Sequence, residues 1–182
     1  MKYFIDIVGL ETLEHQERWE EARILLYKMW LNDKSNPGIL IRLIFECWFV
    51  LAEWYCQIDT ENLSFQTFQN TLIEATDYGI QKQEGNFRFL GILGYMISMF
   101  PYLFCINGTE RLYTDWEQRG IERLRLAYER DPNDLIAKAF WLGTKNGEKE
   151  YADTKKQLLP ILDALFPNDT AVEKYFKEIL TP

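Results

Sequence analysis

Three charged side chains interrupt an otherwise apolar segment, GILIRLIFECWFVLAEWYCQI, at residues 38–58. On a helix with 100° per residue, Arg42, Glu46 and Glu53 fall within about 40° of one another and form one narrow stripe. Two carboxylates on a buried helix could transfer protons, and the stripe could also line a groove for a partner. The Arg42–Glu46 spacing of four residues favours a third interpretation, an internal ion pair. The three interpretations remain open at this point.

Other residues that could do chemistry are few. The only histidine, His15, lies in an acidic stretch, where we expect a solvated side chain. One histidine cannot supply the paired histidines of a zinc protease motif or of a ferritin-like metal site. Gly91 and Gly94 lack the third glycine and the preceding strand of a dinucleotide-binding loop, so we interpret them as positions of close helix packing. A serine nucleophile elbow and a phosphate loop are missing from the sequence. We therefore predict no catalytic residue, no metal and no cofactor, and a protein that is not an enzyme.

The strongest asymmetry in composition is an acidic stretch between Arg42 and Lys82, which contains no basic residue. The carboxylates that we predict to bind a partner lie in this stretch: Glu46, Glu53, Asp59, Glu61, Glu74 and Asp77. Glu14, Glu17 and Glu21 add further acidic side chains at helical spacing. A net charge of −8 and a pI near 4.8 argue against binding to nucleic acid or to an anionic membrane. They suit a basic protein partner, although solvated helix faces would give the same pattern.

Helical periodicity dominates the chain and predicts an all-α fold. We expect about eight helices, near residues 11–32, 38–58, 63–83, 87–106, 110–130, 134–145 and 149–165 and after Thr170. Pro101 should kink or break the fourth helix, Thr109 could cap the fifth, and Thr170 with Glu173 forms a capping box for the last. The segment KYFIDIV at residues 2–8 fits either a strand or a first helix. Because no low-complexity linker divides the chain, we predict a single helical domain over residues 1–182.

Residues 89–106 carry no charge over a length that touches the threshold for a membrane span. Their two glycines, serine, proline and two tyrosines favour a buried core helix instead. Three cysteines without C-x-x-C spacing indicate reduced thiols. The first residues also lack a small-residue cleavage site for secretion. We therefore expect a cytoplasmic protein that does not bind membranes.

The triplet Pro-Asn-Asp occurs twice, starting at Pro132 and at Pro167, and each copy follows a helical segment. The separation of 35 residues is close to the period of helical-hairpin repeats. Residues 136–167 resemble a tetratricopeptide repeat, because Leu142-Gly143 stands at the expected distance before Pro167. Lys155 departs from the pattern at a position where the family prefers alanine.

Residues 18–37 resemble the second helix and exit turn of such a repeat, with Ala22, Leu26 and Met29 at the small and apolar positions. Lys34 replaces the usual proline. The resemblance covers about 50 residues in two pieces. It implies an irregular, tetratricopeptide-like array of antiparallel helical hairpins, and an unrelated helical bundle is the alternative.

In general character the chain is similar to immunity proteins, which are small, acidic, single-domain inhibitors of bacterial toxins. This resemblance implies a protein-binding module without catalytic activity, which neutralises a basic toxin, such as a nuclease, by covering its active cleft. An alternative is a tetratricopeptide-like adaptor that binds a peptide or a chaperone in its concave groove. A third reading is a small-ligand binder or enzyme with a pocket lined by aromatic side chains and the Arg42–Glu46–Glu53 stripe. The oligomeric state stays open.

Overall fold

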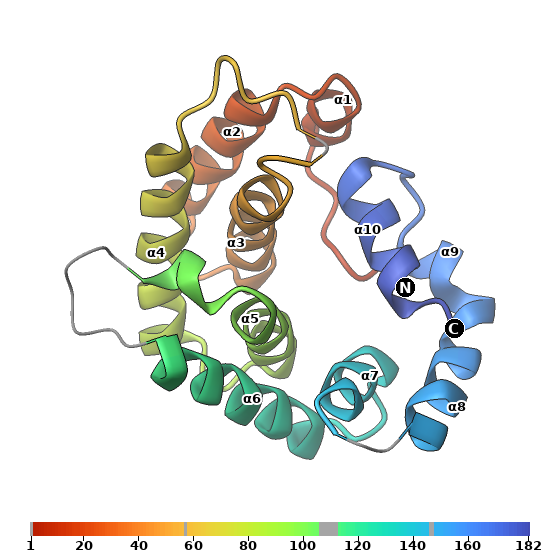
Figure 1. Ribbon diagram of the computed structural model, residues 1–182. Coiled ribbons are helices and arrows are strands. Elements are labelled where there is room, and N and C mark those ends of the chain that lie inside the picture. The colour runs from red at the N-terminus through yellow and green to blue at the C-terminus, as the bar shows by residue number, and fades with distance from the viewer. Residues whose placement is uncertain (1, 57, 106–112, 146–147) are drawn as a thin grey trace.

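The computed structural model describes residues 2–56, 58–105, 113–145 and 148–182, which form helices joined by turns and loops (Figure 1). The elements are α1 (Leu10–His15), α2 (Trp19–Asn32), α3 (Pro37–Ala52), α4 (Phe65–Lys82), α5 (Phe87–Met99), η1 (Pro101–Phe104), α6 (Tyr113–Arg130), α7 (Leu135–Gly143), α8 (Glu148–Leu158), η2 (Leu159–Ile161), α9 (Leu162–Leu165) and α10 (Ala171–Leu180). None of these residues forms a strand. The predicted all-α class is confirmed, and the helices α2 to α8 and α10 agree with the predicted number of about eight.

The helices alternate between an outer and an inner row along the chain. Figure 1 shows α2, α4, α6 and α8 on the outside and α3, α5, α7 and α10 on the inside. Neighbours in sequence pack against each other, as α2 does against α3, α3 against α4, α5 against α6 and α7 against α8. One cluster of buried apolar side chains includes residues from every α-helix, from Leu10 in α1 to Leu180 in α10. The core therefore extends along the whole inner row.

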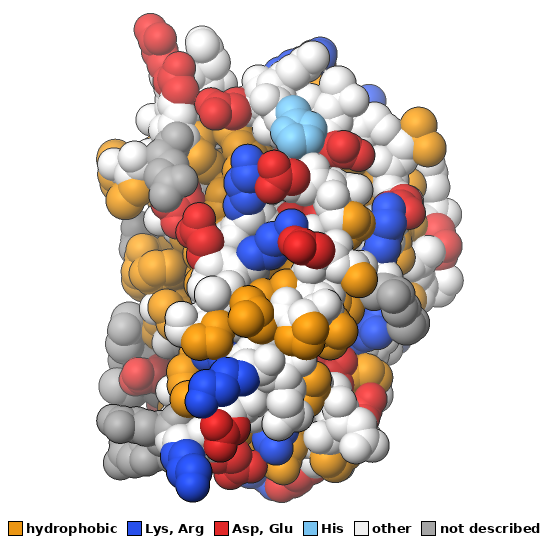
Figure 2. Space-filling model, turned by 90° about the vertical axis from the view of Figure 1, so that its right-hand side faces the viewer, with side chains coloured by type: hydrophobic (Ala, Val, Ile, Leu, Met, Phe, Trp, Pro, Cys, Tyr) orange, Lys and Arg blue, Asp and Glu red, His pale blue; other side chains and the backbone are white. Residues whose placement is uncertain are grey.

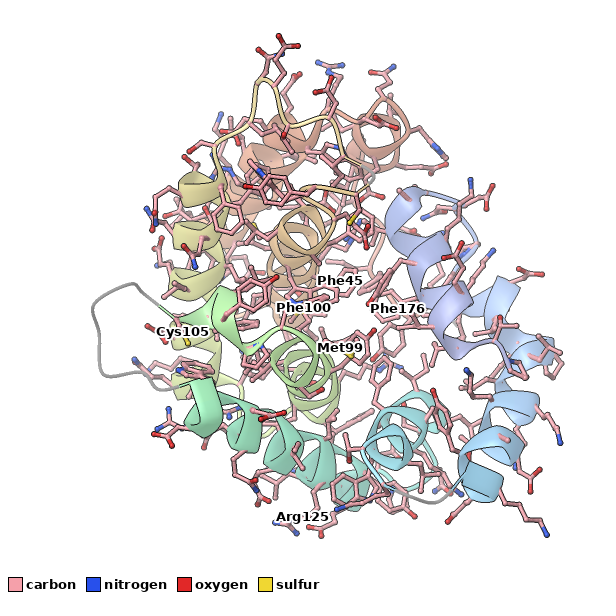
Figure 3. All side chains as sticks on the ribbon, in the orientation of Figure 1. Phe45, Met99, Phe100, Cys105, Arg125 and Phe176 are labelled. Atoms are coloured by element: carbon pink, nitrogen blue, oxygen red, sulfur yellow. The ribbon has the colours of Figure 1, made fainter. Side chains whose placement is uncertain are left out.

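Aromatic side chains from the inner helices meet in the space that these helices surround. Phe45 of α3 and Phe176 of α10 point toward each other (Figure 3), with ring centroids 4.4 Å apart. Tyr95 of α5 stacks on Phe140 of α7 at 4.4 Å, and its hydroxyl lies 2.5 Å from the hydroxyl of Tyr175 in α10. Such pairs stabilise a fold beyond the burial of their area. The side of the array that would be concave is thus filled by the protein's own side chains.

The segment at residues 2–8 adds to this filling, and it is neither the strand nor the helix that its sequence allowed. Tyr3, Phe4 and Ile7 are buried. The Tyr3 N–H donates a hydrogen bond to the carbonyl oxygen of Leu165 at 2.9 Å, and the Phe4 ring lies 5.2 Å from the ring of Phe176. This segment is therefore held by side-chain packing between the inner helices.

The helices α5 and α6 approach each other most closely at glycines. A Cβ on Gly94 would lie 2.9 Å from the carbonyl oxygen of Gly120, and a Cβ on Gly120 would lie 2.8 Å from the Ser98 nitrogen. Gly91 makes an ordinary contact, since its Cβ would lie 3.6 Å from the Cβ of Ala127. The predicted packing role of Gly91 and Gly94 is confirmed. Only at Gly94 would a Cβ be too close to its neighbours, so only there is glycine required.

Three predicted helices are shorter than expected or are interrupted. The helix expected at residues 11–32 is divided into α1 and α2 by a turn in which Glu17 has φ 54°. The helix expected at 38–58 ends at Ala52, after which Trp54 packs edge to face on Phe65 of α4 at 5.2 Å. The helix expected at 149–165 is interrupted at Pro160 by the 3-10 turn η2, because proline removes a backbone donor.

Other boundaries follow their sequence signals. The break at Pro101 is confirmed, since α5 ends at Met99 and η1 begins at the proline. Thr170 caps α10 by accepting from the Glu173 N–H at 3.4 Å. The reciprocal half of the capping box differs, because the Glu173 carboxylate accepts from the Asn168 N–H at 2.5 Å. Thr109 lies outside the described residues.

The uncharged stretch predicted to be a core helix is buried along α5, where Ile92, Leu93, Met96 and Ile97 are at most 1% exposed. Of the helices that the structure describes, none has both the length and the hydropathy needed to cross a membrane. Of the three cysteines, Cys47 is buried, Cys56 is exposed and Cys105 is half-buried.

Candidate protein-binding surface

The outer helices α2 and α4 lie side by side. Two of the predicted partner-binding residues, Glu74 and Asp77, are on α4. The Tyr27 hydroxyl of α2 donates to Oε2 of Glu74 in α4 at 2.8 Å, and Arg23 Nη1 donates to Thr71 Oγ1 at 3.0 Å. Glu74 is exposed, and Asp77, about one turn further along α4, is half-buried. These contacts place the carboxylates of α4 next to the acidic side chains of α2.

The loop between α3 and α4 brings two more predicted residues to the start of α2. Asp59 Oδ1 accepts a hydrogen bond from the Glu61 N–H at 3.0 Å, which fixes the turn. A cleft of about 330 Å³ lies between this loop and α2, and Asp59 lines it together with Glu17, Glu20 and Glu21. Carboxylates from three separate segments therefore gather on one side of the molecule.

We call these seven carboxylates the acidic surface: Glu17, Glu20, Glu21, Asp59, Glu61, Glu74 and Asp77. Two arginines offset part of its charge, since Arg23 pairs with Glu20 at 2.6 Å and Arg18 pairs with Glu21 at 2.5 Å. Within the described part of the chain, no lysine or arginine nitrogen lies within 4.0 Å of four of the carboxylates, those of Glu17, Asp59, Glu61 and Glu74. The acidic surface thus keeps an excess of solvated negative charge.

Two predicted partner-binding residues lie elsewhere. Glu46 is 0% exposed within α3, so its assignment to a partner-binding surface was wrong. Glu53 directly follows α3 and is half-buried. Its charge interacts with Tyr175 of the inner helix α10. Burial raises the pKa of Tyr175 in α10 to about 12, and the charge of Glu53 adds to that increase. The stripe inferred from the helical wheel is therefore divided, with Arg42 and Glu46 in one place and Glu53 in another.

Arg42 and Glu46 belong to a buried charge cluster that joins three helices. We define this Arg42 cluster as Arg42, Glu46, Glu14 of α1 and Glu173 of α10, and each is at most 5% exposed. Arg42 Nη1 lies 3.0 Å from Glu46 Oε2, and Nη2 forms a second ion pair with Glu14 Oε1. The guanidinium also lies over the ring of Phe4 at 5.1 Å. The predicted internal ion pair of Arg42 and Glu46 is confirmed.

Burial shifts two carboxyl groups of the Arg42 cluster, those of Glu46 and Glu173, toward the protonated form. Burial raises the pKa of Glu46 and outweighs the opposing attraction of Arg42. Burial also raises the pKa of Glu173, against hydrogen bonding from the Asn168 N–H and the charge of Arg42. Burial lowers the pKa of Arg42 itself, yet a guanidinium stays charged in proteins. One buried cation thus faces three carboxyl groups, a set that ties α1, α3 and α10 together.

A pocket of about 340 Å³ opens beside this cluster, with Glu14, Arg42 and Glu173 on one wall and residues 4–12 on another. Its polar walls could hold a small polar ligand. Glu46 and Glu53 do not line it, so it is not the pocket expected from the Arg42–Glu46–Glu53 stripe.

Sequence reasoning missed Glu20 in the acidic surface, because the basic-free stretch begins only after Arg42. Its proximity to Glu17 and Glu21 was the available signal. His15 is exposed as expected, with Nε2 at 3.7 Å from Glu11 Oε1. In residues 2–56, 58–105, 113–145 and 148–182, no group of three or more His, Cys, Asp or Glu could hold a metal ion.

Comparison with protein-family models, with curated proteins and with solved structures finds no match.

Proposed function

We propose that this chain is a protein-binding module without catalytic activity, and that its acidic surface binds a basic protein. Its most specific form is an immunity protein that neutralises a basic bacterial toxin, such as a nuclease, by covering the active cleft. The observation that carries the proposal is the gathering of carboxylates from α2, α4 and the loop between α3 and α4 on one side of the molecule.

Four of these carboxylates lack a basic side chain within ion-pair distance. Exposed charges of this kind contribute little to the stability of a fold. They do attract a partner of opposite charge, because complementary potentials raise the rate of association and select the orientation of binding. Lysine and arginine side chains of the partner would supply the missing counter-ions.

The alternation of inner and outer helices supports a tetratricopeptide-like array as the scaffold of this module. An adaptor that binds a peptide in its concave groove is a weaker proposal, because aromatic side chains and residues 2–8 fill the inner space. A small-ligand binder would use the pocket beside the Arg42 cluster. The charged side chains beside that pocket already pair with one another and join helices, so a ligand is not needed to explain them.

The first experiment captures partners of the tagged chain from its own organism, elutes them with salt and identifies them by mass spectrometry. The principal candidate is then purified and its dissociation constant is measured. We expect one basic protein, bound with a stoichiometry of one and released at high salt. If this partner is a nuclease, the chain should also stop its cleavage of nucleic acid.

The test of the site is a variant with Asp59→Lys, Glu61→Lys and Glu74→Lys. We expect it to lose at least about tenfold in affinity, since interface charge pairs couple by about 1.5 kcal/mol or more. A matched control carries Asp153→Lys, Asp163→Lys and Glu178→Lys, which make the same charge change on the opposite side of the molecule (Figure 1). Figure 2 shows that face, where side chains of both charges are mixed. Equal affinity of the two variants would reject the acidic surface as the site, provided that both melt as the wild type does.

A further inference from the structure

A pocket of about 410 Å³ on the outer helix α6 has the opposite charge to the acidic surface. Three arginines line it, Arg119, Arg123 and Arg130, and they outnumber its two glutamates, Glu84 and Glu122. Leu90 and Leu126 contribute apolar surface. On a helical wheel, the arginines and Leu126 fall within about 60° of one another, so one face of α6 carries them all. We call this set the arginine face.

The three guanidinium groups have no carboxylate counter-ion. Across the described residues, no Asp or Glu oxygen lies within 4.0 Å of any of them. Arg123 is half-buried and donates to the backbone carbonyl of Arg119 at 3.1 Å, and the Arg119 guanidinium lies 5.6 Å from the ring centre of Trp116. Burial lowers the pKa of Arg123, while the charge of Glu84 across the pocket acts in the opposite direction. A partly desolvated cation without an anion is unfavourable, and an arriving anion would relieve it.

Arg125 on the same helix differs from these three arginines, because it has carboxylate partners. It pairs with Glu122 at 2.5 Å and also with Glu129. On the helical wheel it lies about 100° or more from the arginine face, and Figure 3 shows it pointing away from the array of helices. Because Glu122 is occupied by Arg125, this carboxylate offsets little of the charge of the arginine face.

The spacing of the arginines limits the shape of an anionic ligand. Arg119 and Arg123 are one turn apart, and Arg130 lies about 10 Å further along the axis, at 1.5 Å per residue. Side chains four residues apart in an extended peptide lie on the same face and span about 13 Å, at 3.3 Å per residue, and the side chain midway between them shares that face. This span lies between the axial distances from Arg130 to Arg123 and from Arg130 to Arg119, about 10 Å and about 16 Å. An aliphatic side chain between them would lie against Leu90 and Leu126. We propose that the arginine face binds an extended acidic peptide segment of a partner protein, in which two carboxylates flank an aliphatic residue.

The proposal does not depend on the function of the acidic surface, since the two surfaces carry opposite charge and bind opposite ligands. The probe is a fluorescent peptide with blocked ends and the sequence Gly-Glu-Ser-Leu-Ser-Glu-Gly, titrated with the full chain at low salt. We expect saturable binding that a peptide with glutamine in place of both glutamates does not show.

The arginine variants make the test specific. Arg123→Gln should weaken binding about tenfold, because a hydrogen bond to a charged group contributes about 1.5 kcal/mol or more. Arg130 is exposed, so Arg130→Gln should weaken peptide binding about threefold without an effect on folding. Lys28→Gln is the matched control, since it removes one charge from an exposed position on α2, and it should bind within about twofold of the wild type.

Several outcomes would overturn the proposal. One is the absence of saturation by the wild type at millimolar peptide, and another is unchanged binding by both arginine variants. Pyrophosphate that binds with the same dependence on Arg123 and Arg130, while the peptide does not, would assign the site to a small phosphate ligand. Self-association of the wild type that Arg130→Gln abolishes would assign it to a second copy of this chain.

Discussion

The Arg42 cluster and the acidic surface are both rich in carboxylates, but they differ in every property that determines what a carboxylate does. Glu14, Glu46 and Glu173 are at most 5% exposed; the first two pair with the Arg42 guanidinium, and Glu173 interacts with its charge. Asp59 and Glu61 are exposed, and their charges are solvated. Desolvation makes the first set sensitive to the loss of one partner, whereas solvent screens the second set.

This difference separates stability from recognition within one acidic protein. Side chains of the Arg42 cluster hold helices together and are not accessible to another protein. Side chains of the acidic surface add little to the fold and are free to exchange water for a partner. Three changes, from the largest expected effect to the smallest, test whether the separation holds.

The largest effect should follow from Arg42→Met, which leaves the buried carboxyl groups of Glu14 and Glu46 without their ion-pair partner. Removal of one partner of a buried ion pair costs about 3–5 kcal/mol, so we expect a loss of this size in the free energy of unfolding measured with urea. The control is Arg18→Met, which breaks the exposed pair with Glu21 and should cost far less, because solvent screens that pair. Similar losses of stability in the two variants would show that the buried ion pairs do not stabilise the fold more than an exposed pair does.

An intermediate effect should appear in the pH dependence of stability. Burial raises the pKa of Glu46 above 4.5, so above that pH the folded protein binds more protons than the unfolded chain. Stability then falls as the pH rises from 4.5 toward the raised pKa, by up to about 1.4 kcal/mol per pH unit for one proton. Glu46→Gln cannot lose a proton, so its stability relative to the wild type should increase over the pH range that begins at 4.5 and extends to the raised pKa of Glu46.

Urea unfolding of both proteins at several pH values in that range checks this expectation. Glu173 is present in both proteins and contributes a slope of the same sign, so only the difference between them reports on Glu46. A difference that stays constant with pH would show that Glu46 does not change its protonation on unfolding.

The smallest effect on stability should follow from Glu61→Gln combined with Glu74→Gln. Both side chains are exposed, and glutamine can still accept the hydrogen bond of Tyr27, so the free energy of unfolding should change by less than about 0.5 kcal/mol. The rate of association with a basic partner should fall nevertheless, and its dependence on salt should weaken. Stopped-flow binding at two salt concentrations measures both. A stability loss near that of Arg42→Met would place these carboxylates in the structural set.

The sequence predicted the local half of the Arg42 cluster and could not predict the rest. The ion pair of Arg42 and Glu46 follows from a spacing of four residues on one helix. Glu14 and Glu173 reach Arg42 only because α1 and α10 pack beside α3, which is tertiary information. That limit does not explain the error at Glu46, because the apolar residues around it in the segment 38–58 already indicated a buried helix.

Local signals also failed where a residue adopts an uncommon conformation. Glu17 has φ 54° at the turn between α1 and α2, in a region where glycine or asparagine is usual. The sequence there reads as uninterrupted helix, so residues 11–32 were predicted as one. Conversely, proline at 101 and the Thr170 cap act through their own backbone and side chain, and both were predicted correctly.

The packing of Tyr3 and Phe4 against α9 and α10 joins the two ends of the described chain. An open array of hairpins adds one unit at a time, and each unit needs only its neighbours. Here Phe4 must wait for Phe166 and Phe176, which are synthesised much later, before it is covered. Contacts between such distant positions slow folding. A nascent chain therefore exposes this aromatic segment until α10 has been synthesised, and the packing of α10 then covers it.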